Sequence, residues 1–181
     1  MNDNKQYILD NRDKALQEGW ITAYYQPIIR AVNGRVCDEE ALARWIDPVK
    51  GFLSPADFIP VLEEEKLIYK VDLHILDCVL EKMKYMVNTG HYVCSHSINL
   101  SRSDFDMCDM VQEIVTRVDK SGIPRDKINI EITESTLVND FKFMLSQIEK
   151  FKRLGFSVWM DDFGSGYSSL NTLARIPFDT T

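Results

Sequence analysis

From about residue 90 onward, the sequence alternates between β-type and helix-type patterns, and this alternation constrains the fold more than any other feature. Short apolar runs are followed by stretches whose apolar residues recur every three or four positions, and the unit repeats at intervals of roughly 30 residues. The alternation predicts strands at 92–100, 127–132 and 156–160, and helices at about 104–120, 135–154 and 168–175. Because a parallel strand pair needs a long crossover connection, units of this kind indicate a parallel sheet.

The N-terminal part of the chain predicts a helix followed by a hairpin. Residues 1–19 have helical spacing, with Gly19 as the stop, and we expect them to form a separate N-terminal helix. Two β-rich runs follow, 21–29 and 35–44, joined across Asn33–Gly34. This dipeptide favours a tight hairpin because both residues tolerate a positive φ.

Two helices are expected between the hairpin and the alternating region. Ser54 and Pro55 predict a helix start, with serine as the N-cap and proline at the first helical position. A second helix covers about 70–88, where one apolar stripe contains Val71, Ile75, Val79, Met83 and Met86.

The length of 181 residues suits one domain but leaves two α/β architectures open. A closed eight-stranded α/β barrel takes about 250 residues, so this chain has room for about five or six of the strands. The fold is therefore either an open, doubly wound sheet or part of a barrel, and the residue pattern alone does not choose between them.

Composition excludes several classes of function. No apolar run reaches the ~20 residues that span a bilayer, and the N-terminus lacks a signal-peptide pattern, so we expect no membrane segment and a cytoplasmic location. The net charge of −7 argues against DNA binding, although it allows a small phosphate ligand held through metal ions. The four cysteines and three histidines lack the close spacing of a zinc site or redox pair.

Oxygen-bearing side chains fall near the ends of four expected strands. They are Glu40, Asn99, Glu131 and the adjacent pair Asp161 and Asp162. The carboxyl ends of parallel strands meet at one edge, which is the active-site edge of α/β proteins. Oxygen ligands without His or Cys select Mg²⁺, Mn²⁺ or Ca²⁺, and adjacent aspartates suggest two metals of the kind used in phosphoester hydrolysis.

A glycine-punctuated loop, 161–169, follows the last of these strands. Such a loop can bring backbone amides close to a phosphate or move as a lid, although ordinary turn chemistry also explains its glycines.

Six segments of the chain resemble, in the same order, the successive motifs of the EAL family of cyclic-di-GMP phosphodiesterases. They are Tyr25-Gln26-Pro27-Ile28-Ile29, Glu40-Ala41-Leu42-Ala43-Arg44-Trp45, Ser54-Pro55-Ala56-Asp57-Phe58-Ile59-Pro60, Asn99-Leu100-Ser101, Glu131-Ile132-Thr133-Glu134 and Asp161-Asp162-Phe163-Gly164-Ser165-Gly166-Tyr167-Ser168-Ser169-Leu170. The resemblance covers residues 20–181 and implies a modified TIM-type (β/α)₈ barrel whose first strand is antiparallel to the others.

The resemblance also implies roles for particular residues. The positions that match the family's metal ligands are Glu40, Asn99, Glu131, Asp161 and Asp162, with Asp161 bridging two ions. Gln26 and Arg44 match residues that contact the dinucleotide, and Arg44 offers a planar fork suited to a phosphate. Glu134 matches the residue that anchors the loop after strand 156–160, and with Glu40, Asp161 and Asp162 it completes the expected catalytic set.

The activity implied by the resemblance is hydrolysis of the second messenger cyclic-di-GMP to linear pGpG with Mg²⁺ or Mn²⁺, Ca²⁺ being inhibitory. A homodimer through this domain, and sensor or diguanylate cyclase domains elsewhere in the protein, are expected partners. The family's catalytic lysine and final glutamate would follow Thr181, so we expect residues 1–181 to be an incomplete domain that is inactive alone. The alternative is a non-catalytic cyclic-di-GMP receptor or an interaction scaffold.

Overall fold

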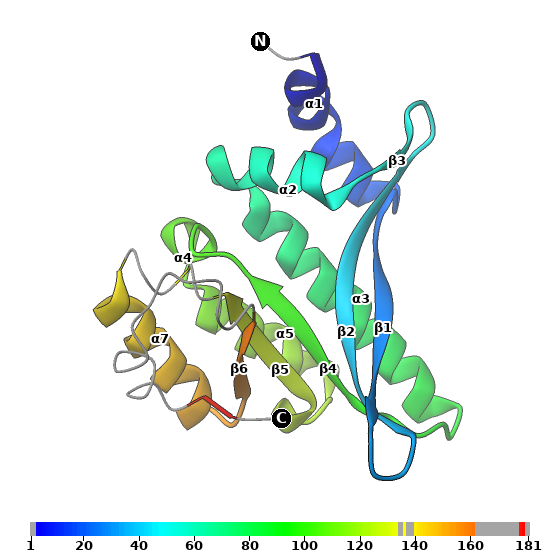
Figure 1. The fold of residues 1–181 in the computed structure, drawn as a ribbon, viewed down its shortest axis with the longest axis vertical. Helices are drawn as coiled ribbons and strands as arrows, with labels where there is room; N and C mark the ends of the chain where they lie inside the picture. The colour runs from blue at the N-terminus through cyan, green and yellow to red at the C-terminus, as the bar shows by residue number, and fades with distance from the viewer. Residues whose placement is uncertain (1–2, 134–135, 137–139, 162–177, 180–181) are drawn as a thin grey trace.

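A single mixed sheet runs through the chain, with helices against one of its faces (Figure 1). The computed structural model describes residues 3–133, 136, 140–161 and 178–179. The strands are β1 Ile21–Arg30, β2 Arg35–Asp47, β3 Gly51–Leu53, β4 Ser95–Leu100, β5 Ile128–Thr133 and β6 Ser157–Asp161. The helices are α1 Asp3–Gln17, α2 Pro55–Glu64, α3 Ile68–Asn88, α4 Asp104–Met107, α5 Met110–Ser121, the 3₁₀ turn Arg125–Lys127 and α7 Phe141–Arg153.

The strand order decides between the two architectures that the sequence left open. The order is β1-β2-β4-β5-β6, with β3 paired to β2 off this path. β2, β4, β5 and β6 are parallel, whereas β1 is antiparallel to β2. Strands that follow in chain order across the sheet, all with their helices on one side, are the arrangement of an α/β barrel wall rather than a doubly wound sheet. The fold is thus a partial, modified TIM barrel with an antiparallel first strand, as expected.

The predicted hairpin and helix start are both confirmed. Gly34 has a φ of +65°, and its N–H donates to the carbonyl of Arg30 at 2.9 Å. The side chain of Asn33 accepts from the N–H of Arg35 at 3.1 Å, so the two residues close the turn together. Ser54 caps α2 by accepting from the N–H of Ala56 at 3.3 Å, with proline next to it at the first helical position.

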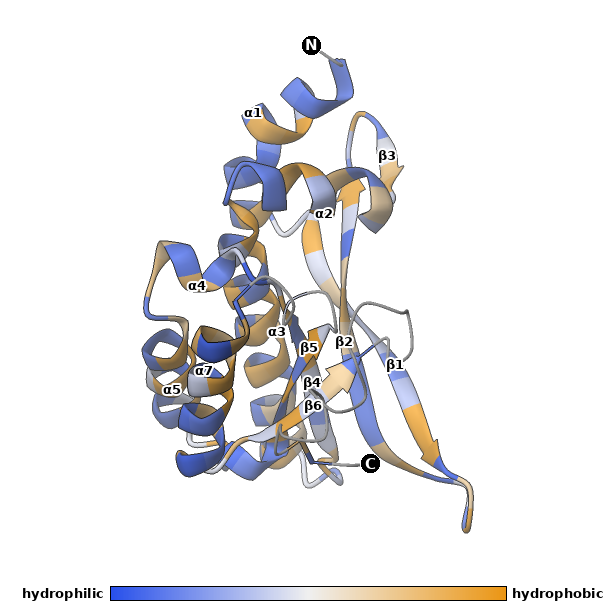
Figure 2. Cartoon of the chain, turned by 60° about the vertical axis from the view of Figure 1, so that its left-hand side comes forward, coloured by the Kyte–Doolittle hydropathy of each residue, from blue (hydrophilic) through white to orange (hydrophobic). Residues whose placement is uncertain are grey.

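The hydrophobic core lies between the sheet and helices α3, α5 and α7, which Figure 2 shows on the same side of β4, β5 and β6. Isoleucines alternate along β5, and Ile128, Ile130 and Ile132 are all fully buried. Trp45 from β2 and Phe58 from α2 are also fully buried and pack edge to face, with ring centroids 5.7 Å apart. This packing leaves the other face of each strand, with its polar residues, turned toward the barrel interior.

Two predicted elements differ in extent. The expected strand 92–100 begins only at Ser95, where pairing with Asp38 of β2 starts. The expected helix 104–120 is two helices, because Cys108 is extended (φ −155°, ψ 170°) and Asp109 restarts the chain as the N-cap of α5. Helical spacing continues across this break, so the apolar pattern alone does not reveal it.

Three other boundaries are corrected. The expected helix 135–154 does not run unbroken, because Asp140 is non-helical (φ −152°) and caps α7 through the N–H of Phe143. The strand expected at 156–160 is β6, one residue later, and the strand expected at 35–44 continues to Asp47 because β3 pairs with its end. The helix expected at 168–175 lies outside the described residues.

Candidate active site

The polar face of the sheet gathers the expected site residues from successive strands. Side chains alternate along a strand, and the pairing places Gln26 opposite Glu40 and Asn99 opposite Glu131. Glu40 was expected at the end of its strand, but β2 continues beyond it. Glu40 instead lies near the end of the part of β2 that pairs with β4, residues 38–41. Beyond that point β2 bends away with β1 and β3, so Glu40 still lies at the carboxyl edge of the parallel sheet.

Glu40 and Asn99 are in direct contact across β2 and β4. The Nδ2 of Asn99 donates to Oε1 of Glu40 at 3.1 Å. This bond orients the Glu40 carboxylate. The side-chain oxygen of Asn99 is a second polar atom at the same edge. Both side chains are half-buried, so they remain accessible from the barrel interior.

Glu131 on β5 is the most perturbed group of the face. It is 7% exposed, and burial raises its pKa to about 7. The Ser97 hydroxyl beside it acts in the opposite direction, whereas the negative charges of Glu40 and Asp161 raise the pKa further. Three carboxylates from β2, β5 and β6 are therefore close enough to repel one another.

Asp161 is the last residue of β6 and pairs with Thr133 at the end of β5. It therefore lies at the carboxyl edge, as expected, and contributes to the raised pKa of Glu131. Asp162, Glu134 and the loop after Asp161 lie outside the described residues, so their expected roles stay predictions.

The expected substrate-binding residues share the face of Glu40. Gln26 is exposed and lies opposite Glu40 on β1, and Arg44 lies four residues further along β2. The Nη1 of Arg44 donates to the carbonyl of Ala43 at 2.8 Å, leaving the rest of the guanidinium fork for another acceptor. Their contact with a dinucleotide stays a prediction.

A second polar layer, which sequence reasoning missed, lies deeper in the same face. The Nδ2 of Asn129 donates to Oδ2 of Asp38 at 2.5 Å, and both side chains are buried. Burial raises the pKa of Asp38 to about 6. Each residue is two positions before an expected ligand, Glu40 or Glu131, and this spacing was the available signal.

A cavity of about 470 Å³ opens at the carboxyl edge beside these residues. Its lining includes Asn99, Thr133, Leu100 as the last residue of β4, and the segment that follows it, residues 101–103. Glu63 of α2 closes one side and bonds the Ser101 hydroxyl. The cavity has the size of an ordinary small-ligand site and is lined by Asn99 of the candidate ligand set.

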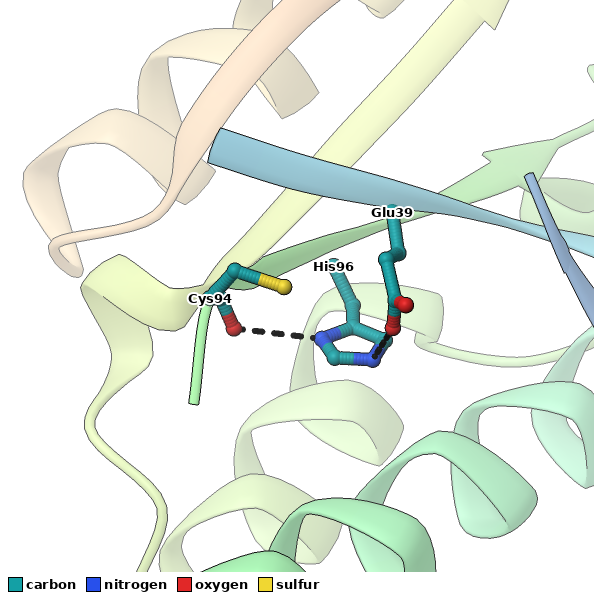
Figure 3. A group of neighbouring side chains, drawn as sticks. All are labelled: Glu39, Cys94 and His96. Atoms are coloured by element: carbon teal, nitrogen blue, oxygen red, sulfur yellow. Dashed lines mark hydrogen bonds and ion pairs between the residues drawn. The ribbon is translucent and has the colours of Figure 1, made fainter. Parts of the chain in front are cut away.

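The structure also brings together side chains whose spacing in the sequence did not indicate a site. Glu39, Cys94 and His96 lie on the helix-facing side of β2 and β4, where one ligand atom from each falls within 4.8 Å of the others (Figure 3). Lys82 of α3 bonds the Glu39 carboxylate, and its ammonium lies 3.5 Å from the centre of the Tyr25 ring. This group is on the opposite face of the sheet from the expected metal ligands.

Within the described residues, no helix has the length and apolar character that a bilayer crossing requires.

Comparisons with known proteins find relatives that match nearly the whole chain. MucR of Pseudomonas aeruginosa, a bifunctional diguanylate cyclase/cyclic di-GMP phosphodiesterase, is 32% identical over 180 residues, which are 98% of this chain and 26% of MucR. The cyclic di-GMP phosphodiesterase PdeR of Escherichia coli is 35% identical over 171 residues, 93% of this chain and 25% of PdeR. The chain thus spans about a quarter of the length of these relatives.

Solved structures give the same result. The PaMucR phosphodiesterase in complex with c-di-GMP matches with a TM-score of 0.87 and 31% identity, covering 96% of this chain and 70% of that one. The EAL domain family matches residues 10–180, nearly the whole chain. The partial barrel agrees with this match, and this chain therefore belongs to the EAL domain family.

Proposed function

We propose that this domain binds cyclic-di-GMP and hydrolyses one of its phosphodiester bonds, with water added and linear pGpG released. The observation that carries the proposal is the convergence of Glu40, Asn99, Glu131 and Asp161 at one carboxyl edge. Relatives that are 32% and 35% identical to this chain over the aligned region are named as phosphodiesterases of this dinucleotide, which supports the substrate.

The residues at this edge suit a hard divalent cation. All of their donor atoms are oxygens, and the negative charges of Glu40 and Asp161 add to burial in raising the pKa of Glu131. Glu40, Asn99, Glu131 and Asp161 would hold one Mg²⁺ or Mn²⁺, and Asp161 with Asp162 a second. Such ions would supply Lewis-acid stabilisation of charge on the phosphate and lower the pKa of the attacking water.

The chain's own residues would position the dinucleotide against this edge. Asn99 holds the Glu40 carboxylate in place through its amide. Arg44 can offer two parallel N–H donors to a phosphate, and Gln26 can bond the substrate from the neighbouring strand. Glu131 would lose its proton when a cation binds, so protons are released on metal binding at neutral pH.

The test measures binding and turnover separately. Calorimetric titration of cyclic-di-GMP with Ca²⁺ present measures binding, and chromatography of pGpG after incubation with Mg²⁺ or Mn²⁺ measures hydrolysis. Glu131→Gln is expected to abolish hydrolysis in any active form of the domain. Glu149→Gln is the matched control, because Glu149 is exposed on α7, away from the site. Failure of the unaltered chain to bind the dinucleotide would contradict the proposal.

The same measurements address the remaining predictions. Binding without pGpG formation by the 181-residue chain is the expected result, and measurable Mg²⁺-dependent turnover by this polypeptide would refute that expectation. Binding without turnover in the longest form of the protein would favour the receptor function. Dimerisation and linked sensor or cyclase domains also stay predictions, the first to be measured by sedimentation.

A further inference from the structure

Glu39, Cys94 and His96 form a compact group behind the proposed active site. Glu39 precedes Glu40 on β2, so its side chain points to the opposite face of the sheet. Cys94 is 4% exposed and His96 is fully buried, and Figure 3 shows both beside the Glu39 carboxylate. The group joins two strands that are far apart in the sequence.

The hydrogen bonds of His96 indicate which ring nitrogen carries the proton. Its Nδ1 lies 3.2 Å from the carbonyl oxygen of Cys94, which can only accept, so Nδ1 donates (Figure 3). The other ring nitrogen, Nε2, faces the Glu39 carboxylate and is buried, and it makes no hydrogen bond within the described part of the chain.

This arrangement places an unpartnered ring nitrogen next to a carboxylate oxygen. Nε2 of His96 and Oε2 of Glu39 are 2.8 Å apart. A buried ring nitrogen without a hydrogen-bond partner is costly, and a metal ion bound to it would remove that cost. Cys94 supplies a third ligand, and one ligand atom from each of the three residues lies within 4.8 Å of the others.

We propose that Glu39, Cys94 and His96 bind a borderline-soft divalent metal ion, of which Zn²⁺ is the best fit. One sulfur, one imidazole nitrogen and one carboxylate oxygen are ligands typical of zinc, and three protein ligands leave a fourth position for water. The site is distinct from the oxygen-only edge of Glu40, because it lies on the other face of β2 and contains sulfur and nitrogen.

The ammonium of Lys82 supplies, beside Glu39, the positive charge that a metal ion would supply. Its ammonium bonds the Glu39 carboxylate and lies over Tyr25, but its side chain is 26% exposed. The lysine can therefore move toward solvent when a metal ion takes over the carboxylate. Lys82 is accordingly a competitor of the metal, and its removal strengthens metal binding.

The test is a titration of the reduced, metal-stripped 181-residue chain with Co²⁺ in excess Mg²⁺. Mg²⁺ is added to occupy the oxygen-only edge, and a thiolate-to-cobalt charge-transfer band reports a cysteine ligand, which the variants below identify. We expect one equivalent of Co²⁺ to give this band and Zn²⁺ to remove it. Absence of the band in the folded protein overturns the proposal.

Variants and a labelling measurement complete the test. Cys94→Ser is expected to lose the band, whereas Cys37→Ser keeps it, since Cys37 is a half-buried cysteine whose Sγ bonds the carbonyl of Ile28. Lys82→Gln is expected to tighten Co²⁺ binding by about tenfold, because a positive charge in contact with Glu39 is lost. Zn²⁺ should also protect Cys94 of the unaltered chain from alkylation, so the test does not depend on a variant that folds. A band in Cys94→Ser, or alkylation unaffected by Zn²⁺, refutes the site.

Discussion

Replacing Asp104 with asparagine should change how the stability of this domain depends on pH. Asp104 is the first residue of α4 and is fully buried, and its Oδ2 accepts from the N–H of Ser101 at 2.8 Å. Asp72 of α3 is electrostatically coupled to it, and the charge of Glu63 from α2 acts on both acids. Because Ser101 follows the strand that carries Asn99, Asp104 supports the carboxyl edge of the candidate site through its bond with Ser101.

The direction follows from the raised pKa of Asp104. Burial raises it from 3.8 to about 7, and the Glu63 charge adds to this, although the bonds from Asp72 and Ser101 act in the opposite direction. The folded state therefore holds a proton that the unfolded chain has already lost. This contribution is complete below about pH 4 and disappears as the pH rises through 7. Between pH 5 and pH 8, the loss is at most about 3 kcal/mol, and we expect about 2 kcal/mol because the pair relaxes when it ionises.

Asp104→Asn can keep the bond from the N–H of Ser101, and it removes the ionisable group at this position. The Asn carbonyl can accept from Ser101, and its amide can donate to Asp72. Compared with the unaltered chain, the variant should lose about 2 kcal/mol less stability between pH 5 and pH 8. Urea denaturation followed by circular dichroism across this range measures the difference, with exposed Asp126→Asn as the control. Identical pH dependence in Asp104→Asn and the unaltered chain would refute the reasoning.

Three further results are expected. Glu131→Gln should abolish the rise in melting temperature that Mg²⁺ produces, whereas Glu149→Gln should keep it, as scanning calorimetry would measure; an unchanged rise in Glu131→Gln would count against a metal at this edge. Trp45→Ala should lower the free energy of unfolding in urea by about 3–5 kcal/mol, because the indole is fully buried against Phe58, and a loss below about 1 kcal/mol would contradict that packing. Ser54→Ala should cost about 1 kcal/mol in the same assay through loss of the α2 cap, and Ser54→Asp, which keeps a capping oxygen, should restore most of it.

Local features of the fold were predictable wherever one short segment carries the physical cause. Gly34 and Asn33 close the hairpin through their own backbone and side-chain bonds, and Ser54 caps the helix that it begins. Prediction failed where partners from elsewhere decide the boundary. β4 starts at Ser95 because Asp38 pairs with it there, and the extension of β2 to Asp47 depends on β3.

The candidate site was predictable in part for the same reason. Oxygen-bearing side chains near strand ends pointed to Glu40, Asn99, Glu131 and Asp161, since parallel strands bring their carboxyl ends together. The strength of their interaction, visible in the raised pKa of Glu131, depends on burial and on distances between strands. Neither quantity can be calculated from a one-dimensional pattern.

The sequence by itself determined the order of strands and helices, the turn and cap residues, and the identity of the acids at the carboxyl edge. These depend on local geometry and on the two-residue period of a strand. Only the tertiary structure decided which face each residue occupies. Glu39 and Glu40 are neighbours in the chain, yet the pairing of β2 with β4 and the packing of α3 send one toward His96 and the other toward Asn99. A strand's period separates its two faces, but only its neighbours in space define what each face meets.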